Sequence, residues 1–212
     1  METAAADRDL VNRLRAGDER AFRELVQRHH AAMVRFAETF VPSRAVAEEV
    51  AQEAWLGVIK GIDRFEGRAA LSTWIFRIVA NIGRTRGERE RRTVPASSLS
   101  DELADATGTP SVPADRFSGP PGRGAWSQPP SRWGDAPDER ILSQATFDRV
   151  SSIAASLPEN QRRVFVLRDV EGYSSTEVCD MLELSEVNQR VLLHRARSRI
   201  RGALEPDLAV PR

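Results

Sequence analysis

Apolar residues recur at helical spacing in two separate stretches of the chain. In the first stretch, residues 7–93, they fall three and four positions apart in three successive runs, preceded by Asp18, Ser43 and Ser72. The side-chain oxygen of each of these residues can accept a backbone N–H in the first turn of a helix, so each is a predicted N-cap. No run alternates strictly between apolar and polar positions, and we therefore predict an all-α fold.

The second stretch, residues 138–205, has the same periodicity and is interrupted by short polar turns. Ser174 and Glu177 have the spacing of a capping box, in which each side chain accepts a backbone N–H of the first helical turn. This pair predicts a short helix over 174–182, and a tight turn then leads to a long helix over 186–203. Two helices of these lengths joined by such a turn are typical of a helix–turn–helix.

Residues 94–137 differ in composition from both stretches. They hold eight of the twelve prolines and five of the thirteen glycines, together with many serines. A segment of this composition buries too little apolar surface to offset the entropy lost on ordering. We therefore predict two small helical domains, 7–93 and 138–205, joined by a flexible linker over 94–137. The sequence assigns no role to Trp126 and Trp133 in this linker.

The formal net charge is zero, but the charges are unevenly distributed. No acid lies between Asn188 and Arg201 in the helix predicted over 186–203, which instead carries Arg190, Arg195, Arg197, Arg199 and Arg201. Such a row of cations suits the phosphates of DNA. Asn188, Gln189 and Arg190 in its first turn are residue types that pair with the edges of adenine and guanine. The alternative is a solvated basic helix that only packs through its apolar face.

An acidic segment, 48–56, has carboxylates on one side of its predicted helix and apolar residues on the other. It is either a solvated face or a docking surface for a basic partner. A third hypothesis is a metal-dependent nuclease that uses Glu48, Glu49 and Glu53, but no histidine lies at ligand spacing from these acids. We therefore predict no catalytic site, metal or cofactor. The polar N-terminus has no apolar run, which predicts a cytoplasmic protein.

Several motifs resemble the RNA polymerase sigma factors of the extracytoplasmic-function (ECF) type. Region two of that family resembles Glu-Glu-Val-Ala-Gln-Glu-Ala-Trp-Leu at 48–56, Asp-Arg-Phe at 63–65, and Leu-Ser-Thr-Trp-Ile-Phe-Arg-Ile-Val-Ala-Asn at 71–81. Region four resembles Leu-Pro-Glu-Asn-Gln-Arg-Arg-Val-Phe-Val-Leu-Arg at 157–168, Glu-Gly-Tyr-Ser at 171–174, and His-Arg-Ala-Arg at 194–197. The motifs occur in the family's order and together cover both stretches.

The resemblance implies a factor that carries core RNA polymerase to promoter DNA and is restrained by an anti-sigma factor. The residues implied for polymerase binding are Glu49, Gln52, Glu53 and Leu56. Those implied for the minus-ten DNA are Arg64, Phe65, Arg77, Asn81 and Arg84, with the loop 63–71 accepting a flipped base. Those expected to contact the minus-thirty-five DNA are Asn188, Gln189, Arg190, His194, Arg195, Arg197 and Arg199.

The chain departs from the family at the start of the predicted recognition helix. Val-Asn-Gln-Arg-Val-Leu-Leu stands at 187–193, where family members often have Gly-Thr-Val-Lys-Ser-Arg-Leu. The resemblance therefore implies no particular promoter sequence. An alternative function is a freestanding helix–turn–helix regulator that uses only residues 138–205, but this would leave residues 7–93 without a role.

Overall fold

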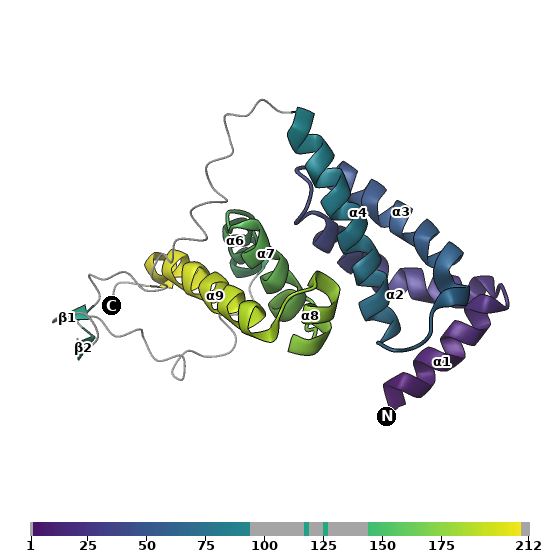
Figure 1. The fold of residues 1–212 in the computed structure, drawn as a ribbon. Coiled ribbons are helices and arrows are strands. Elements are labelled where there is room, and N and C mark those ends of the chain that lie inside the picture. Colours follow the sequence, from purple (N-terminus) through teal and green to yellow (C-terminus); the bar gives the residue numbers. More distant parts are fainter. Residues whose placement is uncertain (1, 94–116, 119–124, 127–143, 209–212) are drawn as a thin grey trace.

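The computed structural model describes residues 2–93, 117–118, 125–126 and 144–208 (Figure 1). Nearly all of these residues are helical, as the sequence predicted. Most of the predicted linker, including Trp133, lies outside the described residues. Inside it, β1 (Phe117–Ser118) pairs antiparallel with β2 (Ala125–Trp126), a short ladder that the sequence pattern did not predict.

The first block contains α1 (Glu2–Arg15), α2 (Glu19–Ala37), α3 (Arg44–Gly61) and α4 (Leu71–Thr93), with a 3₁₀ turn (Ile62–Arg64) after α3. Two of its predicted caps are confirmed, because Asp18 caps α2 and Ser43 caps α3 through their side chains. The third was wrong, since Ser72 lies inside α4. Asp7, far away in the sequence, caps this helix instead, because its Oδ2 accepts the N–H of Leu71 at 3.1 Å.

The second block contains α6 (Gln144–Ala155), α7 (Glu159–Phe165), a π-helical turn (Val166–Val170), α8 (Ser175–Leu182) and α9 (Glu186–Leu208). The predicted capping box of Ser174 and Glu177 is present at the start of α8. Glu183 follows α8 in the left-handed conformation, with φ 58°, and makes the turn into α9. Ser185 Oγ accepts the N–H of Asn188 at 3.3 Å and caps α9. The helix–turn–helix is therefore confirmed.

Each block has a buried apolar interior. In the first block, α2, α3 and α4 pack together over fully buried side chains that include Leu25, Phe36, Val58 and Phe76. In the second block, α6, α7 and α9 enclose a smaller cluster of Ala154, Leu157, Phe165, Ala196 and Ile200.

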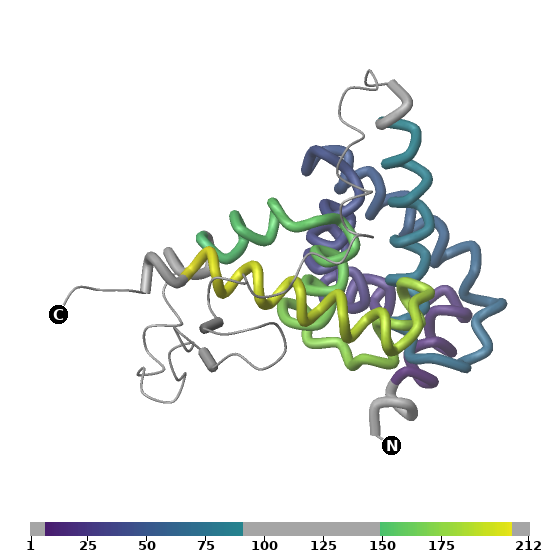
Figure 2. Tube along the Cα trace, turned by 60° about the vertical axis from the view of Figure 1, so that its left-hand side comes forward, coloured from purple at the N-terminus to yellow at the C-terminus, as the bar shows by residue number. Residues whose placement is uncertain are grey.

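The two blocks also pack on one another, with α8 against α4 and the π-helical turn against α2 (Figures 1 and 2). Leu167, Val178 and Met181 of the second block belong to the same apolar cluster as Phe36 and Phe76 of the first. The ring of Tyr173 lies 5.1 Å from that of Phe76 between centroids. The linker therefore joins two blocks that share a continuous core.

Candidate nucleic-acid interface

Helix α3 presents one mixed polar and apolar face to solvent. Its Val50, Ala54 and Val58 recur every four residues and are buried against the bundle, which turns the opposite side of the helix outward. Three of the four residues predicted for polymerase binding, Gln52, Glu53 and Leu56, lie exposed on that side. The fourth, Glu49, is also exposed and pairs with Arg86 of α4.

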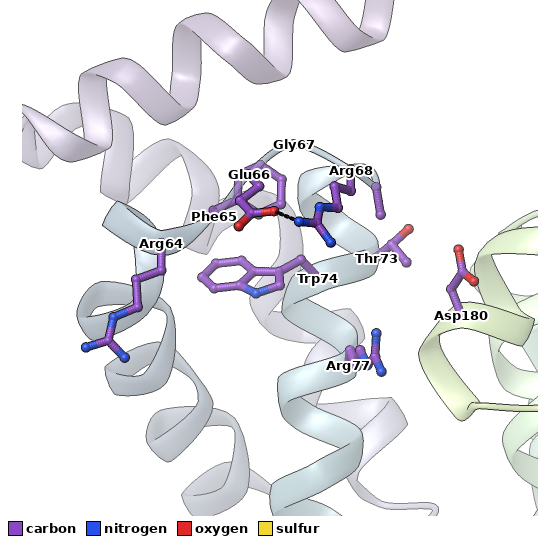
Figure 3. A pocket seen from close by; sticks show the side chains of 10 residues that line it. Arg64, Phe65, Glu66, Gly67, Arg68, Thr73, Trp74, Arg77 and Asp180 are labelled. Atoms are coloured by element: carbon purple, nitrogen blue, oxygen red, sulfur yellow. Dashed lines mark ion pairs between the residues drawn. The ribbon is translucent and has the colours of Figure 1, made fainter.

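The loop between the 3₁₀ turn and α4 forms one wall of a pocket of about 340 Å³ (Figure 3). The rings of Phe65 and Trp74 lie 5.2 Å apart at its apolar side. Arg15 of α1 holds the loop in place, donating to the carbonyl oxygens of Ile62 at 3.2 Å and Phe65 at 2.6 Å. In Figure 3, Arg64 points away from the aromatic pair. Arg64 still lines the pocket, but its guanidinium does not approach the two rings.

Thr73 adds a polar group to the wall of this pocket. Its side chain belongs to the first turn of α4 and the residue is only 2% exposed. Within the part of the chain that the structure describes, its hydroxyl has no hydrogen-bond partner. A buried hydroxyl in that condition costs about 1–3 kcal/mol, so a polar ligand atom that reached it would gain free energy.

Helix α4 carries the other residues predicted for the minus-ten DNA. Arg77, Asn81 and Arg84 are four and three positions apart, which places them on one face, and Arg84 donates to Asn81 at 3.1 Å. In this arrangement α8 lies along that face and contacts it, but Arg77 and Asn81 remain exposed. Arg77 donates to Glu183 at 2.8 Å, and Arg84 donates to the carbonyl oxygen of Leu182 at 3.1 Å. The hydrogen bond from Arg77 lowers the pKa of the Glu183 carboxyl.

The predicted minus-thirty-five residues divide according to their position on α9. Most of them reach solvent, namely Asn188, Arg190, His194, Arg197 and Arg199, whereas Arg195 is half-buried. Arg197 also makes a bidentate ion pair with Asp169, at 2.8 and 2.6 Å.

Gln189 differs from the other predicted minus-thirty-five residues, because it is only 3% exposed. Its side-chain oxygen accepts a hydrogen bond from Ser175 Oγ at 2.8 Å. This bond joins α9 to α8, so Gln189 holds the two helices of the motif together. A contact with a base edge requires a side chain that projects into solvent. We therefore propose no base contact for Gln189.

Sequence reasoning missed several residues that shape these surfaces. Arg15 and Thr73 had no local signal, because their importance comes from contacts across the fold. Val187 and Val191 lie exposed on α9, and this could have been read from the sequence, since they fall on the side opposite Leu192, Leu193 and Ala196.

No described helix has the length and apolarity needed to cross a membrane. Among the same residues, no three His, Cys, Asp or Glu side chains are grouped so that they could hold a metal ion.

Comparison with known protein families gives two matches. A sigma-70 region 2 model matches residues 25–93, and a sigma-70 region 4 model matches residues 147–200. Together they cover more than half of the chain. The first match contains the exposed face of α3, the aromatic pocket and the basic face of α4, and the second contains α7, the π-helical turn and the helix–turn–helix.

Curated relatives match over almost their whole length. The ECF RNA polymerase sigma-E factor of Escherichia coli (strain K12) is 28% identical over 206 residues, which cover 97% of this chain and 98% of that protein. The RNA polymerase sigma-H factor of Pseudomonas aeruginosa is 27% identical over 208 residues, 98% of each chain.

Solved structures give the same result. The structure of CnrH in complex with the cytosolic domain of CnrY matches with a TM-score of 0.59 and 25% identity, over 95% of this chain and 99% of that chain. The sigma factor RpoE of Bartonella quintana, in complex with the anti-sigma factor NepR, shares the fold with a TM-score of 0.57 and 18% identity, over 88% and 98% of the two chains. The chain belongs to the sigma-70 family, as an ECF-type RNA polymerase sigma factor.

Proposed function

We propose that this sigma factor divides promoter recognition among three surfaces. The exposed face of α3 binds core RNA polymerase, the pocket and basic face beside α4 bind the melted minus-ten strand, and α9 reads the minus-thirty-five duplex. The observation that carries the proposal is that each surface falls inside the matching sigma region and presents the side-chain chemistry that its ligand needs.

For polymerase, the chemistry is a carboxylate and an amide beside an exposed leucine. Glu53, Gln52 and Leu56 lie within about one turn of α3 and are all exposed. An exposed aliphatic side chain ringed by polar groups suits a protein partner, since it gains from being covered while its neighbours fix the orientation.

For the minus-ten DNA, the pocket suits a single unstacked base. Phe65 and Trp74 offer aromatic surface for stacking, and base–aromatic stacking contributes about 1–3 kcal/mol per base. The hydroxyl of Thr73, unpaired and buried at the wall of the pocket, would gain a partner if a side-chain rearrangement let the edge of that base reach it. Arg77 and Arg84 would then contact the phosphates of the strand along α4, after their present partners on α8 have been exchanged for DNA.

For the minus-thirty-five element, α9 would lie in the major groove with its first turns against the bases. Arg190 and His194 are exposed one turn apart on its outer face, and Asn188 is exposed in its first turn. The arginines further along α9 would hold the phosphate backbone, a contact that positions the protein without reading sequence.

In this proposal the factor contributes recognition and the polymerase contributes the chemistry of RNA synthesis. It would work in the cytoplasm, where polymerase meets the chromosome. The structural relatives CnrH and RpoE were solved with CnrY and with the anti-sigma factor NepR, which supports an anti-sigma factor as a third partner besides core polymerase and promoter DNA.

The test is transcription in vitro with core polymerase on a genomic DNA library. We expect defined start sites that require both proteins. A double variant, Gln52→Lys with Glu53→Lys, should lose co-purification with core polymerase and all of these starts. The matched control, Glu24→Lys with Gln27→Lys, makes the same charge change on the exposed side of α2 and should retain both activities.

Two results would contradict the proposal. One is normal polymerase binding by the α3 double variant. The other is tight and specific binding of the same promoters by the isolated factor with no effect of polymerase, which would indicate a freestanding helix–turn–helix regulator.

A further inference from the structure

The outer face of the recognition helix carries two valines that the fold leaves uncovered. Val187 is 70% exposed and Val191 is 42% exposed, and they lie one turn apart on α9. Neighbouring positions of the same helix are buried against α7 and α8, among them Leu192 and Leu193. The valines therefore do not contribute to the core, although each exposes apolar surface to water.

The charges around these valines indicate what covers them. Arg190 lies between them in sequence and His194 follows one turn later, both exposed. Glu186 precedes Val187 at the start of this helix, but no acid occurs between Asn188 and Arg201. A ligand that covers the valines must therefore accept a row of cations, which DNA does and an ordinary apolar protein surface does not.

The major groove of DNA has one apolar group for such a side chain to meet, the C5 methyl of thymine. We propose that Val187 and Val191 determine specificity by contacting thymine methyls in the minus-thirty-five element. Four residues of helix rise about 6 Å, and base pairs are stacked about 3.4 Å apart. The two thymines therefore lie about two base pairs apart, with Arg190 placed to reach a guanine close by. The inference rests on the proposed reading of this element by α9.

The test replaces thymine by deoxyuridine, which keeps the base pair and removes only the methyl. The probe is a promoter obtained by selecting randomised upstream sequence with the holoenzyme. Each thymine of its minus-thirty-five element is replaced singly, and holoenzyme affinity for the duplex is measured. Loss of one buried methyl should weaken binding by about three- to fourfold. We expect that loss at two positions.

Variants assign each methyl to its valine. Val187→Ala should bind the thymine and uracil forms equally at one position, and Val191→Ala should do so at the other. Val170→Ala is the matched control, because Val170 is also an exposed valine but belongs to the π-helical turn. It should retain the full response to uracil at both positions.

Wild-type affinity that is indifferent to uracil throughout the element would overturn the inference. So would a response to uracil that persists unchanged in both alanine variants, since the methyls would then be read by other residues. Failure of the holoenzyme to select any promoter would instead refute the proposed function, which keeps the two outcomes distinct.

A second inference comes from the contacts that join the blocks. Three carboxylates of the second block face the basic side of the first. Glu171 accepts from Arg35 at 2.8 and 3.2 Å, and Glu183 accepts from Arg77 at 2.8 Å. Asp180 lines the aromatic pocket from the α8 side (Figure 3). Since α8 belongs to region 4 and α4 to region 2, these pairs add to the apolar contacts that join the two DNA-binding regions.

The Glu183 carboxylate is an anionic hydrogen-bond acceptor, as a DNA phosphate is. It binds Arg77, which we propose to contact such a phosphate. We infer that this closed arrangement inhibits the factor, because single-stranded DNA must compete with Glu183 for Arg77 and with the carbonyl oxygen of Leu182 for Arg84. We call Glu171, Asp180 and Glu183 the latch residues. Of these, Glu171 makes the strongest contact, since its side chain is only 9% exposed and its ion pair with Arg35 is bidentate. Its position outside the pocket allows closure to be altered without touching the proposed DNA contacts.

Closure can be measured as a distance. Nitroxide labels on Gln27→Cys and Ser152→Cys, in a chain whose single cysteine is replaced by Cys179→Ser, report the separation of α2 and α6 by electron spin resonance. We expect one short, narrow distance distribution for the otherwise unaltered chain. Arg35→Glu should give longer and broader distances. The charge swap, Arg35→Glu with Glu171→Lys, should restore the short distance, which excludes simple misfolding.

The functional consequence is tested with the non-template minus-ten strand of a promoter that the holoenzyme uses. Glu171→Lys should bind this strand at least threefold more tightly than Glu24→Lys, which makes the same charge change but breaks a pair with Arg13 inside the first block. Equal affinities of these two variants would overturn the inhibitory role. Unchanged distances in Arg35→Glu would overturn the latch itself. Neither result depends on transcription, which tests the proposed function separately.

Discussion

Replacement by alanine should destabilise the protein at Gly87 of α4 and stabilise it at Gly202 of α9. A Cβ at Gly87 would lie 2.4 Å from the backbone oxygen of Phe40, whereas a Cβ at Gly202 would meet nothing within 4 Å. Both residues lie inside helices, where alanine is favoured over glycine by about 1 kcal/mol. We therefore expect Gly202→Ala to stabilise the protein by about 0.5–1 kcal/mol.

For Gly87→Ala the steric cost exceeds the gain in helix propensity. The contact must widen from 2.4 Å to at least 3.0 Å. The Cβ has no side-chain torsion that could move it away and its partner is a backbone oxygen, so α4 has to move away from the segment that follows α2. Overpacking of this kind costs about 1–3 kcal/mol. With the upper part of that range and the propensity gain subtracted, we expect a net loss of about 2 kcal/mol. Urea unfolding followed by circular dichroism measures both variants.

Gly83 provides an internal check on this explanation. Its added Cβ would lie 2.8 Å from the ring of Phe40, not from backbone. In a Phe40→Ala background, Gly83→Ala should therefore change the free energy of unfolding very little relative to Phe40→Ala alone. Gly87→Ala should still lower it in the same background. Stability of Gly87→Ala equal to or above that of the unaltered chain would refute the reasoning.

Three further expectations concern single side chains. The hydrogen bond from Arg13 lowers the pKa of Asp18. The stability that its charge contributes is therefore present above the unfolded pKa of 3.8 and is lost as pH falls through the lower folded pKa. In thermal unfolding, the difference in stability between the unaltered chain and Asp18→Asn should be constant near neutral pH and vanish in acid. Ser174→Ala should destabilise the helix–turn–helix by about 1 kcal/mol in urea unfolding, because it removes one half of the capping box. Arg190→Ala should cost about 1–3 kcal/mol in holoenzyme binding and relax preference at one base pair, whereas Arg199→Ala should weaken all sequences alike and lower the salt slope by about one; the opposite assignment would mean that the orientation of α9 on DNA is wrong.

Several features of the fold could be predicted because their causes are local. The N-caps of Asp18 and Ser43 and the box at Ser174 each depend on a side chain within three residues of the backbone N–H that it binds. The buried faces of the helices follow from apolar spacing of three and four residues, and this also placed Gln52, Glu53 and Leu56 on a solvent-exposed side of α3. The two blocks and their family resemblance were likewise evident from the chain.

Other features depend on which surfaces meet, and periodicity carries no information about that. Leu71 is capped by Asp7, 64 positions away, so the nearer Ser72 was the wrong choice. Gln189 has the residue type of a base reader, but it is buried and its side-chain oxygen accepts a hydrogen bond from Ser175 of α8.

The face of α4 shows most clearly what only tertiary structure decided. Its spacing of Arg77, Asn81 and Arg84 was evident from sequence, but the partner of Arg77 is Glu183, 106 positions later. Such a pair forms because a shared apolar core brings α8 against α4. The sequence by itself thus determined the helices, their caps and the chemistry that each surface presents. Only the packing of the two blocks decided which of those surfaces are open and which are covered, because that choice depends on contacts between segments that no local pattern connects.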